Sequence, residues 1–309
     1  MRGDASATTG LIPADVRARL ASLALTARVA RGEHGFGQHS SRSRGSGMEF
    51  AQYRGYQPGD EPRHVDWKLY ARSDRFFVRE AERDSPLTVW ILVDTTASMA
   101  QSDPPGSGPT RLHSARALAA CLIEMALRQG DRFGLATFGG HGVQVHGAQA
   151  GPRQRDRCLL ALQALVGGGG WPPEPAWQPL WERMGPRSLL LMLGDGFDEA
   201  GTRLAERFAA ARREVACIRI LTIGERDFPL QGGYRFRDPE SGAELLGDAG
   251  AIREGFLQRF GAARVALHAR LAAAGVRQVE YVLDEPLDAP LRRLFAPGTA
   301  AGAVAAGNP

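Results

Sequence analysis

From about residue 86 onward, the hydrophobic and polar positions alternate between two patterns. Short apolar runs, such as PLTVWILVD (86–94) and SLLLMLGD (188–195), are each followed by longer segments with apolar residues at helical spacing. Continuous apolar runs are typical of buried parallel strands, and helical spacing is typical of the helices that cover them. The pattern therefore predicts an α/β fold with a doubly wound, mostly parallel sheet flanked by helices.

Individual elements follow from the same pattern. Residues 111–129 carry apolar side chains on one helical face and are followed by Gly130, which predicts a helix that ends there. RFGLATF (132–138) predicts a strand, and GVQVHG (142–147) predicts a short edge strand that turns back. We also expect helices near 13–31, 153–165, 199–213 and 249–274, and a short last helix that ends at about residue 296. Further strands are expected at 215–224 and 276–285. Residues 234–238 and 243–248 are expected to pair as a hairpin-like insertion.

The composition of the chain changes along its length and suggests three parts. Residues 1–85 are expected to form an N-terminal helix, a Gly, Ser and Arg-rich loop and a signature segment that packs on the core. Residues 86–296 would form the α/β domain. Residues 297–309 would be a disordered tail, because small residues cannot offset the entropy lost on ordering.

Composition excludes several classes of protein. A chain of 309 residues with 43% hydrophobic residues can bury a core, but its longest apolar runs are too short to span a membrane. The N-terminus lacks the apolar centre of a signal peptide, so we expect a cytoplasmic protein. The three cysteines lie far apart in apolar segments, which favours buried reduced thiols. The net charge of +4 is spread along the chain and gives little support for nucleic-acid binding.

Oxygen-bearing side chains follow two of the predicted strands. Asp94, Thr96 and Ser98 occupy alternate positions after the first strand, and Asp195 follows another strongly apolar strand. In an open parallel sheet, ligands bind outside the carboxyl ends of the strands where the strand order reverses. Carboxylates and hydroxyls are ligands that Mg²⁺ accepts, although the same residues also cap turns and helices. The second aspartate adds support to the interpretation as a metal site, and the capping interpretation stays open.

Two stretches together resemble a known family. GMEFAQYRGYQPGDEPRHVDWKLYAR (47–72), followed by LVDTTASM (92–99), is similar to the bacterial family called domain of unknown function 58, whose core resembles the von Willebrand factor A domain. The similarity extends over about residues 15–296 and includes RFRDPESGAELL (235–246). The resemblance implies a doubly wound sheet with a metal-ion-dependent adhesion site, and a partnership with MoxR-type AAA+ ATPases.

The resemblance assigns the metal ligands residue by residue. It places Asp94, Thr96 and Ser98 in the first loop of the site, with Thr96 where serine is commoner, and Asp195 in a later loop. Asp198 is near enough in the sequence only to support these ligands, not to bind the metal itself. The family pattern also takes a threonine hydroxyl from an intervening loop, where this chain has Gly169 or Gly170, so we expect weaker Mg²⁺ binding or a water in that place.

A site of this type implies binding rather than catalysis, because an Asp or Glu of a partner can complete the shell of the metal. Trp171 and Trp177, in the proline-rich loop that follows, could line the binding surface, although buried packing is the stronger expectation. The signature segment places opposite charges among aromatic residues. We expect an internal network of ion pairs and hydrogen bonds there, with a partner-docking surface as the alternative. Its residues are Arg54, Asp60, Arg63, Asp66, Trp67 and Arg72, with Tyr53 and Tyr56 nearby.

The main enzymatic alternative is a haloacid-dehalogenase-like phosphohydrolase that uses Asp94 as its nucleophile with Mg²⁺. Phosphatases of that class require an acidic residue two positions after the nucleophile, where this chain has Thr96. A serine hydrolase based on Ser98 lacks the Gly-x-Ser-x-Gly elbow. The sequence therefore predicts a non-enzymatic protein-binding adaptor or scaffold that works with a MoxR-type ATPase.

Overall fold

The computed structural model describes residues 10–27, 50–57, 65–81, 86–103, 108–186, 188–240 and 242–296. The chain divides into two compact units: the larger combines Met1–Glu33 with Leu87–Pro309, and the smaller consists of His34–Pro86. The expected N-terminal helix, α1 (Ala14–Leu20), thus belongs to the larger unit. The packing of the signature segment on the core and the disordered tail stay predictions.

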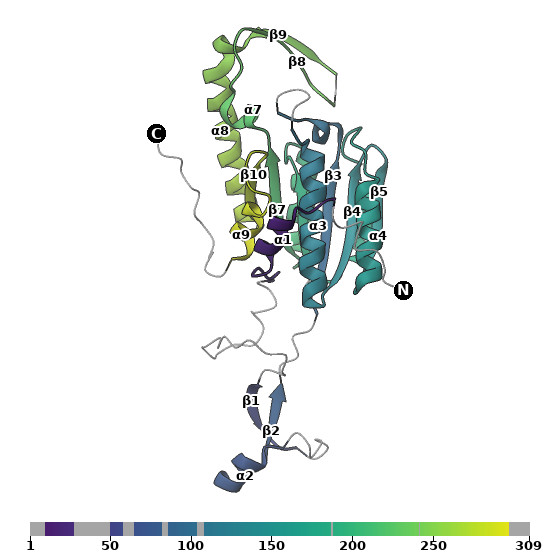
Figure 1. Cartoon of the computed structure of the whole chain (residues 1–309), viewed down its shortest axis with the longest axis vertical. Helices are drawn as coiled ribbons and strands as arrows, with labels where there is room; N and C mark the ends of the chain where they lie inside the picture. Colours follow the sequence, from purple (N-terminus) through teal and green to yellow (C-terminus); the bar gives the residue numbers. More distant parts are fainter. Residues whose placement is uncertain are drawn as a thin grey trace. The chain divides into compact units, whose positions relative to one another are not determined.

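A six-stranded sheet forms the centre of the larger unit (Figure 1). Its order is β10-β7-β6-β3-β4-β5, and all neighbours are parallel except the edge pair β4 and β5. The expected fold class is therefore confirmed, together with the antiparallel edge strand. The strands are β3 (Thr88–Thr95), β4 (Arg132–Gly139), β5 (Gly142–Gln149), β6 (Leu189–Gly194), β7 (Glu214–Leu221) and β10 (Arg277–Val282).

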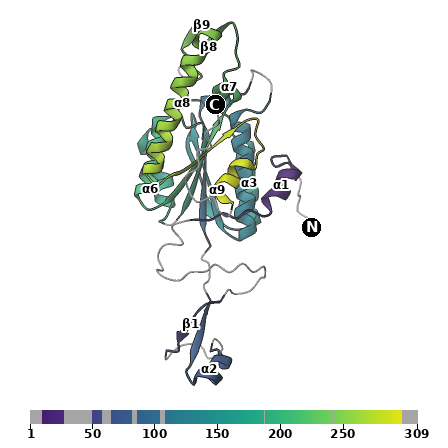
Figure 2. The same cartoon turned by 90° about the vertical axis from the view of Figure 1, so that its left-hand side faces the viewer.

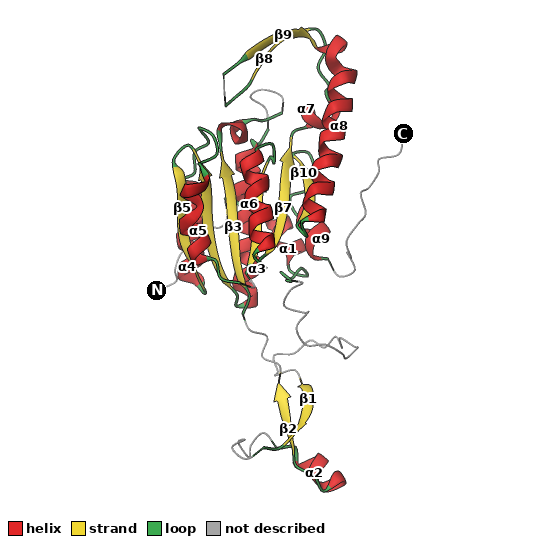
Figure 3. Cartoon of the chain, turned by 180° about the vertical axis from the view of Figure 1, so that it is seen from behind, coloured by secondary structure: helices red, strands yellow, loops and turns green. Residues whose placement is uncertain are grey.

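Helices cover both faces of this sheet (Figures 2 and 3). The helices α1, α3 (Arg111–Gln129), α4 (Pro152–Gln163) and α9 (Ala289–Phe295) contribute to the core on one face. The opposite core contains residues of the 3₁₀ helix η4 (Glu174–Trp177) and of α5 (Gln178–Arg183), α6 (Glu199–Ala210) and α8 (Ala249–Ala273). None of the helices that the structure describes has both the length and the apolar character needed to cross a bilayer.

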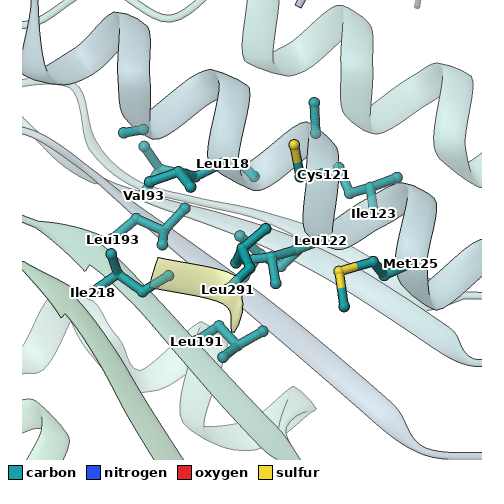
Figure 4. Packing of buried hydrophobic residues seen from close by; sticks show 14 of the residues in the cluster. Val93, Leu118, Cys121, Leu122, Ile123, Met125, Leu191, Leu193, Ile218 and Leu291 are labelled. Atoms are coloured by element: carbon teal, nitrogen blue, oxygen red, sulfur yellow. The ribbon is translucent and has the colours of Figure 1, made fainter. Parts of the chain in front are cut away.

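Successive residues of β3 explain the two layers of core. Val93 points to the α3 side and packs among Leu118 and Leu193 (Figure 4), whereas Leu92 belongs to the opposite core. This alternation is the period-two geometry of a strand that is buried on both faces. The continuous apolar runs in the sequence therefore mark the central strands.

The N-terminal helix is shorter than the expected range of 13–31, since α1 ends at Leu20. Leu23 and Leu25 are buried, but they lie in an irregular segment. The Gln129 side chain accepts a hydrogen bond from the Leu25 N–H at 2.7 Å and donates one to the Leu25 carbonyl at 3.1 Å. Tertiary contacts with the end of α3 thus replace the helical hydrogen bonds here.

Two features follow β7. The expected hairpin is present as β8 (Gly233–Arg237) paired with β9 (Glu244–Asp248). The strand expected up to residue 224 instead ends at Leu221, and the helix α7 (Ile223–Asp227) follows. The helix begins there because Thr222 and Glu225 form a capping box, in which each side chain accepts the backbone N–H of the other residue.

The smaller unit contains elements that the sequence pattern did not predict. The strands β1 (Phe50–Gly55) and β2 (Phe77–Ala81) form an antiparallel pair, and α2 (Trp67–Ser73) lies between them in the chain. Asp66 caps α2 by accepting the N–H groups of Lys68 and Leu69. Phe76 stacks on Tyr70 with 4.3 Å between ring centroids and meets Tyr56 and Trp67 at wider angles.

Two residues of the signature segment have local roles in the smaller unit. Asp66 has a capping role, and Trp67 joins the aromatic cluster although its side chain remains 58% exposed. Arg54 lies in β1, whereas Asp60 and Arg63 fall outside the described residues. The ion-pair network expected for these charged residues stays a prediction.

Candidate functional site

The predicted site lies at the reversal point of the sheet. Asp94 is near the end of β3, and Asp195 directly follows β6, which pairs with β3. The two carboxylates are close enough for their charges to interact. Gly194 leaves room for the Asp94 side chain, because a Cβ atom there would lie 2.9 Å from Asp94 Oδ2. The expectation that Asp94 and Asp195 share the carboxyl edge of neighbouring strands is therefore met by the topology.

The first loop brings three oxygen-bearing side chains together. The 3₁₀ helix η3 (Ala97–Ala100) begins one residue after β3, with Thr96 between them, so that the chain turns tightly. Asp94 Oδ1 accepts hydrogen bonds from Thr96 N at 2.8 Å and from Thr96 Oγ1 at 2.7 Å. Thr96 Oγ1 lies 3.0 Å from Ser98 Oγ. Carboxylate and hydroxyl oxygens are ligand types that Mg²⁺ accepts, so the chemistry of this donor set is compatible with that ion. The spacings themselves are those of ordinary hydrogen bonds.

The electrostatics of the loop also suit a cation. Asp94 is only 3% exposed, and its pKa is raised to about 7. Burial is the main cause and the nearby charge of Asp195 adds to it, whereas hydrogen bonds from Thr96 and the Trp171 side chain act in the opposite direction. A divalent cation beside these oxygens would offset the cost of the buried charge. Within the described residues, no group of three or more His, Cys, Asp or Glu side chains could hold a metal, so the candidate site depends on hydroxyl ligands.

Arg111 is a site residue that the sequence analysis missed. It is the first residue of α3 and is 1% exposed. Its guanidinium donates to the Ser98 carbonyl at 2.9 Å, to Asp195 Oδ2 at 3.2 Å and to Glu225 Oε1. Asp195 Oδ1 accepts the Phe197 N–H at 3.1 Å. Asp195 is thus held by two partners, and Arg111 joins the loops that follow β3, β6 and β7.

The sequence carried only a weak signal for this arginine. Thr110 accepts the N–H of His113 and caps α3, so the sequence predicts where the helix starts. Nothing in the local pattern predicts that the side chain of Arg111, the next residue, points into the protein. The two acidic partners of Arg111, Asp195 and Glu225, lie 84 and 114 residues away in the chain. Recognising its role therefore required the folded structure.

The two glycine positions where the hydroxyl ligand was expected differ in the room they leave for a side chain. Gly169 has φ +63°, and a Cβ atom there would lie 2.4 Å from Gly140 Cα. Its carbonyl accepts the Ala97 N–H at 2.8 Å, which ties this loop to the first loop of the site. No side chain fits at Gly169 without moving the backbone, whereas a Cβ atom added to Gly170 would meet no heavy atom within 4 Å.

The remaining candidates have packing or capping roles. Trp177 is 3% exposed and donates from Nε1 to the Pro172 carbonyl at 3.0 Å, as expected for a buried tryptophan. Trp171 is half-buried and packs on Phe138 with 5.2 Å between ring centroids. Asp198 caps α6 by accepting the Ala200 N–H. The expected buried reduced thiols are confirmed, since Cys121, Cys158 and Cys217 are buried and free.

Sequence comparison relates this chain to a protein family and to proteins of two mycobacteria. The family model described as "Protein of unknown function DUF58" matches residues 52–266. The uncharacterized protein Rv1480 of Mycobacterium tuberculosis and the uncharacterized protein Mb1516 of Mycobacterium bovis are each 28% identical over 215 residues. Each match covers 67% of this chain and 65% of the relative.

Solved structures of low sequence identity were also found. The conserved hypothetical protein BatB from Bacteroides thetaiotaomicron has a TM-score of 0.40 at 16% identity, and the match covers 63% of this chain and 90% of that one. The SpRpn10 VWA domain has a TM-score of 0.42 at 17% identity, with 71% of this chain and 100% of that one covered.

Proposed function

The chain belongs to the family described as protein of unknown function DUF58, and from this premise we propose that it is a non-enzymatic adaptor or scaffold that binds protein through a cation at the carboxyl edge of its sheet. Its von Willebrand factor A-like α/β fold suggests a role in protein interaction. The observation that carries the proposal is the first loop, where the oxygens of Asp94, Thr96 and Ser98 follow one another at 2.7 and 3.0 Å.

In this proposal Mg²⁺ is held by Asp94, Thr96 and Ser98. The bound ion supplies an attraction for an acidic side chain of a partner, since one carboxylate and two neutral hydroxyls leave it with positive charge. Asp195 adds negative charge nearby, while Arg111 fixes the position of Asp195 and of the Ser98 backbone. The absence of a side chain at Gly169 and Gly170 leaves the site one hydroxyl short, which suits modest affinity for the ion.

The partner in this proposal is a MoxR-type AAA+ ATPase, as the family resemblance implies, with a further client protein. An acidic side chain on the surface of the ATPase would approach the ion, and the surrounding surfaces of the two proteins would form the rest of the interface. The interaction would then require both the ion and the first loop.

The arrangement around Asp94 gives less support to a phosphohydrolase. Both hydrogen bonds from Thr96 converge on Asp94 Oδ1, and this threonine takes the place two residues on where an acidic group would be needed to move a proton. A nucleophilic carboxylate would therefore lack its acid-base partner. We accordingly propose a binding site without covalent chemistry.

Titration of Mg²⁺, or of Mn²⁺ followed by electron paramagnetic resonance, tests the ion site. We expect saturable binding to the unaltered protein and its loss in Asp94→Ala. Asp156→Ala is the matched control, because Asp156 is an exposed aspartate on α4 that pairs with Arg155. Absence of saturable binding in the unaltered protein would remove the ion from the proposal.

Capture of the ATPase tests the interaction. The immobilised protein should retain a MoxR-type ATPase in Mg²⁺ and release it in EDTA, and Asp94→Ala should not retain it. Turnover of a small aryl phosphate that disappears in Asp94→Asn would instead support the phosphohydrolase and overturn the proposal.

A further inference from the structure

The helices α6 and α8 lie side by side on one face of the sheet (Figures 2 and 3), and residues of both line an open groove of about 360 Å³. Of the 25 residues of α8, all of which the structure describes, only Ala249 and Leu271 are buried. On the α8 side the groove is lined by the small side chains of Ala263 and Ala266, beside Leu267. Its volume is within the range of clefts that hold ligands.

Two phenylalanine rings also line this groove. Phe197, two residues after Asp195, is 49% exposed, and its ring centroid lies 6.0 Å from that of the half-buried Phe260. The Phe197 N–H donates to Asp195 Oδ1, which restrains the backbone beneath the exposed ring. A side chain that is already restrained loses little conformational entropy on binding. The groove therefore offers two rings against which a further aromatic side chain can pack.

The charged side chains of the groove are mainly basic: they are Arg219, Arg264, Arg270 and Glu199. Arg270 is compensated, because it pairs with both Glu199 and Glu206. Arg219 and Arg264, in contrast, share the single carboxylate of Glu280. One positive charge of this group therefore remains. Arg264 presents it to solvent, since 34% of its side chain is exposed against 4% for Arg219.

Arg264 is held in a fixed position beside the rings. Its guanidinium lies 5.9 Å from the centroid of the Phe260 ring, in the range of a cation–π contact. Glu280 accepts hydrogen bonds from Nε and Nη2 of Arg264. A guanidinium has five N–H donors, so Nη1 is left to donate to a second carboxylate. The neighbouring carboxylate of Asp195 does not line the groove and pairs with Arg111.

We infer that this groove binds an acidic segment of a protein partner that carries an aromatic side chain. The aromatic ring packs on Phe197 and Phe260 above the two alanines, and a neighbouring carboxylate of the segment accepts a hydrogen bond from Arg264. This binding mode rests on the proposed function in one respect, the existence of a protein partner, and it requires no ion. It extends the interface along α8, because Phe197 belongs both to the loop after β6 and to the groove.

Fluorescence anisotropy with labelled peptides, in EDTA, tests the groove. The probe is a peptide of three Glu-Glu-Phe-Ala repeats, and we expect saturable binding to the unaltered protein. A peptide of Glu-Glu-Ala-Ala repeats lacks the ring, and a peptide of Lys-Lys-Phe-Ala repeats reverses the charge. Each should bind at least about tenfold more weakly, because the first loses the packing on the rings and the second is repelled by Arg264.

Substitutions on α8 locate the bound peptide. Ala263→Glu places a carboxylate in the groove and should weaken binding of the acidic peptide at least about tenfold through like-charge repulsion. Ala262→Glu is the matched control, because Ala262 is exposed on the same helix but does not line the groove. It should bind like the unaltered protein. Arg264→Gln removes the donor and should also weaken binding about tenfold. Thermal melting followed by circular dichroism checks that each variant is folded.

The outcomes separate the groove from the ion site. Equal peptide binding by Ala263→Glu and Ala262→Glu would refute the groove, and so would the absence of binding at protein concentrations up to about 1 mM. Neither result affects the ion site, which the Mg²⁺ titration tests. If Asp94→Ala abolished peptide binding in EDTA while Ala263→Glu retained it, the peptide would bind at the first loop and the groove would be refuted. Equal affinity for the acidic and basic peptides would refute the role of Arg264.

Discussion

Substitution of Gly169 by alanine should destabilise the protein because two constraints meet at this residue. The backbone has φ +63°, where an L-residue with a Cβ atom costs about 1–2 kcal/mol. The added Cβ would also lie 2.4 Å from Gly140 Cα, so the two loops have to separate. Separation weakens the hydrogen bonds Ala97 N to Gly169 O and Gly140 N to Gly168 O, each worth about 1 kcal/mol.

The sum is a loss of about 3 kcal/mol in the free energy of unfolding. For a unit of this size, such a loss lowers Tm by roughly 6–12 °C. Differential scanning calorimetry measures the change, and chemical denaturation gives the free energy independently. Gly170→Ala is the matched control: no heavy atom lies within 4 Å of its Cβ position, and we expect a change below about 0.5 kcal/mol. Equal Tm values for the two variants would refute the close contact between Gly169 and Gly140.

Three further predictions concern buried groups. Arg111→Met should lower stability by about 3–5 kcal/mol in urea denaturation, because it leaves two carboxylates without their buried partner; a change under about 1 kcal/mol would contradict the network. Asp288→Ala should be much more destabilising than Asp15→Ala, since the Asp288 side chain is 0% exposed while that of Asp15 is 65% exposed, and both pair with arginine. The native thiols should resist alkylation at pH 8 and react only on unfolding, because burial raises the pKa values of Cys121, Cys158 and Cys217 to about 12, 11 and 12; fast labelling in the native state would show that the core opens.

Much of the fold could be predicted because the central strands and long helices have strong local patterns. The helix at residues 111–129 was predicted with its observed bounds, since its apolar face and the following glycine both mark it. The hairpin at 233–248 and the antiparallel edge strand were also predicted. Prediction failed where distant contacts decide the structure, as at Leu25, whose backbone is held by the Gln129 side chain.

The candidate site shows the same division between local and distant information. The acidic and hydroxyl residues of the first loop could be located because a strand ends there, and Asp195 because a second strand ends beside it. The contact between Arg111 and Glu225 could not be predicted, because the two residues are 114 positions apart in the chain. The sequence placed the missing hydroxyl ligand at Gly169 or Gly170, and only the contact with Gly140 shows why Gly169 carries no side chain.

The N-terminal helix has a practical consequence for how this protein can be shortened. The apolar side chains of residues 12–25 that enter the core are at most 6% exposed, and Arg19 reaches Asp288, 269 residues away. The match to the family model begins only at residue 52. A fragment that starts there would leave a strip of α3 and α9 uncovered and prone to aggregate. A shortened chain should therefore keep residues 10–27 and join them to strand β3 through a flexible linker in place of the smaller unit.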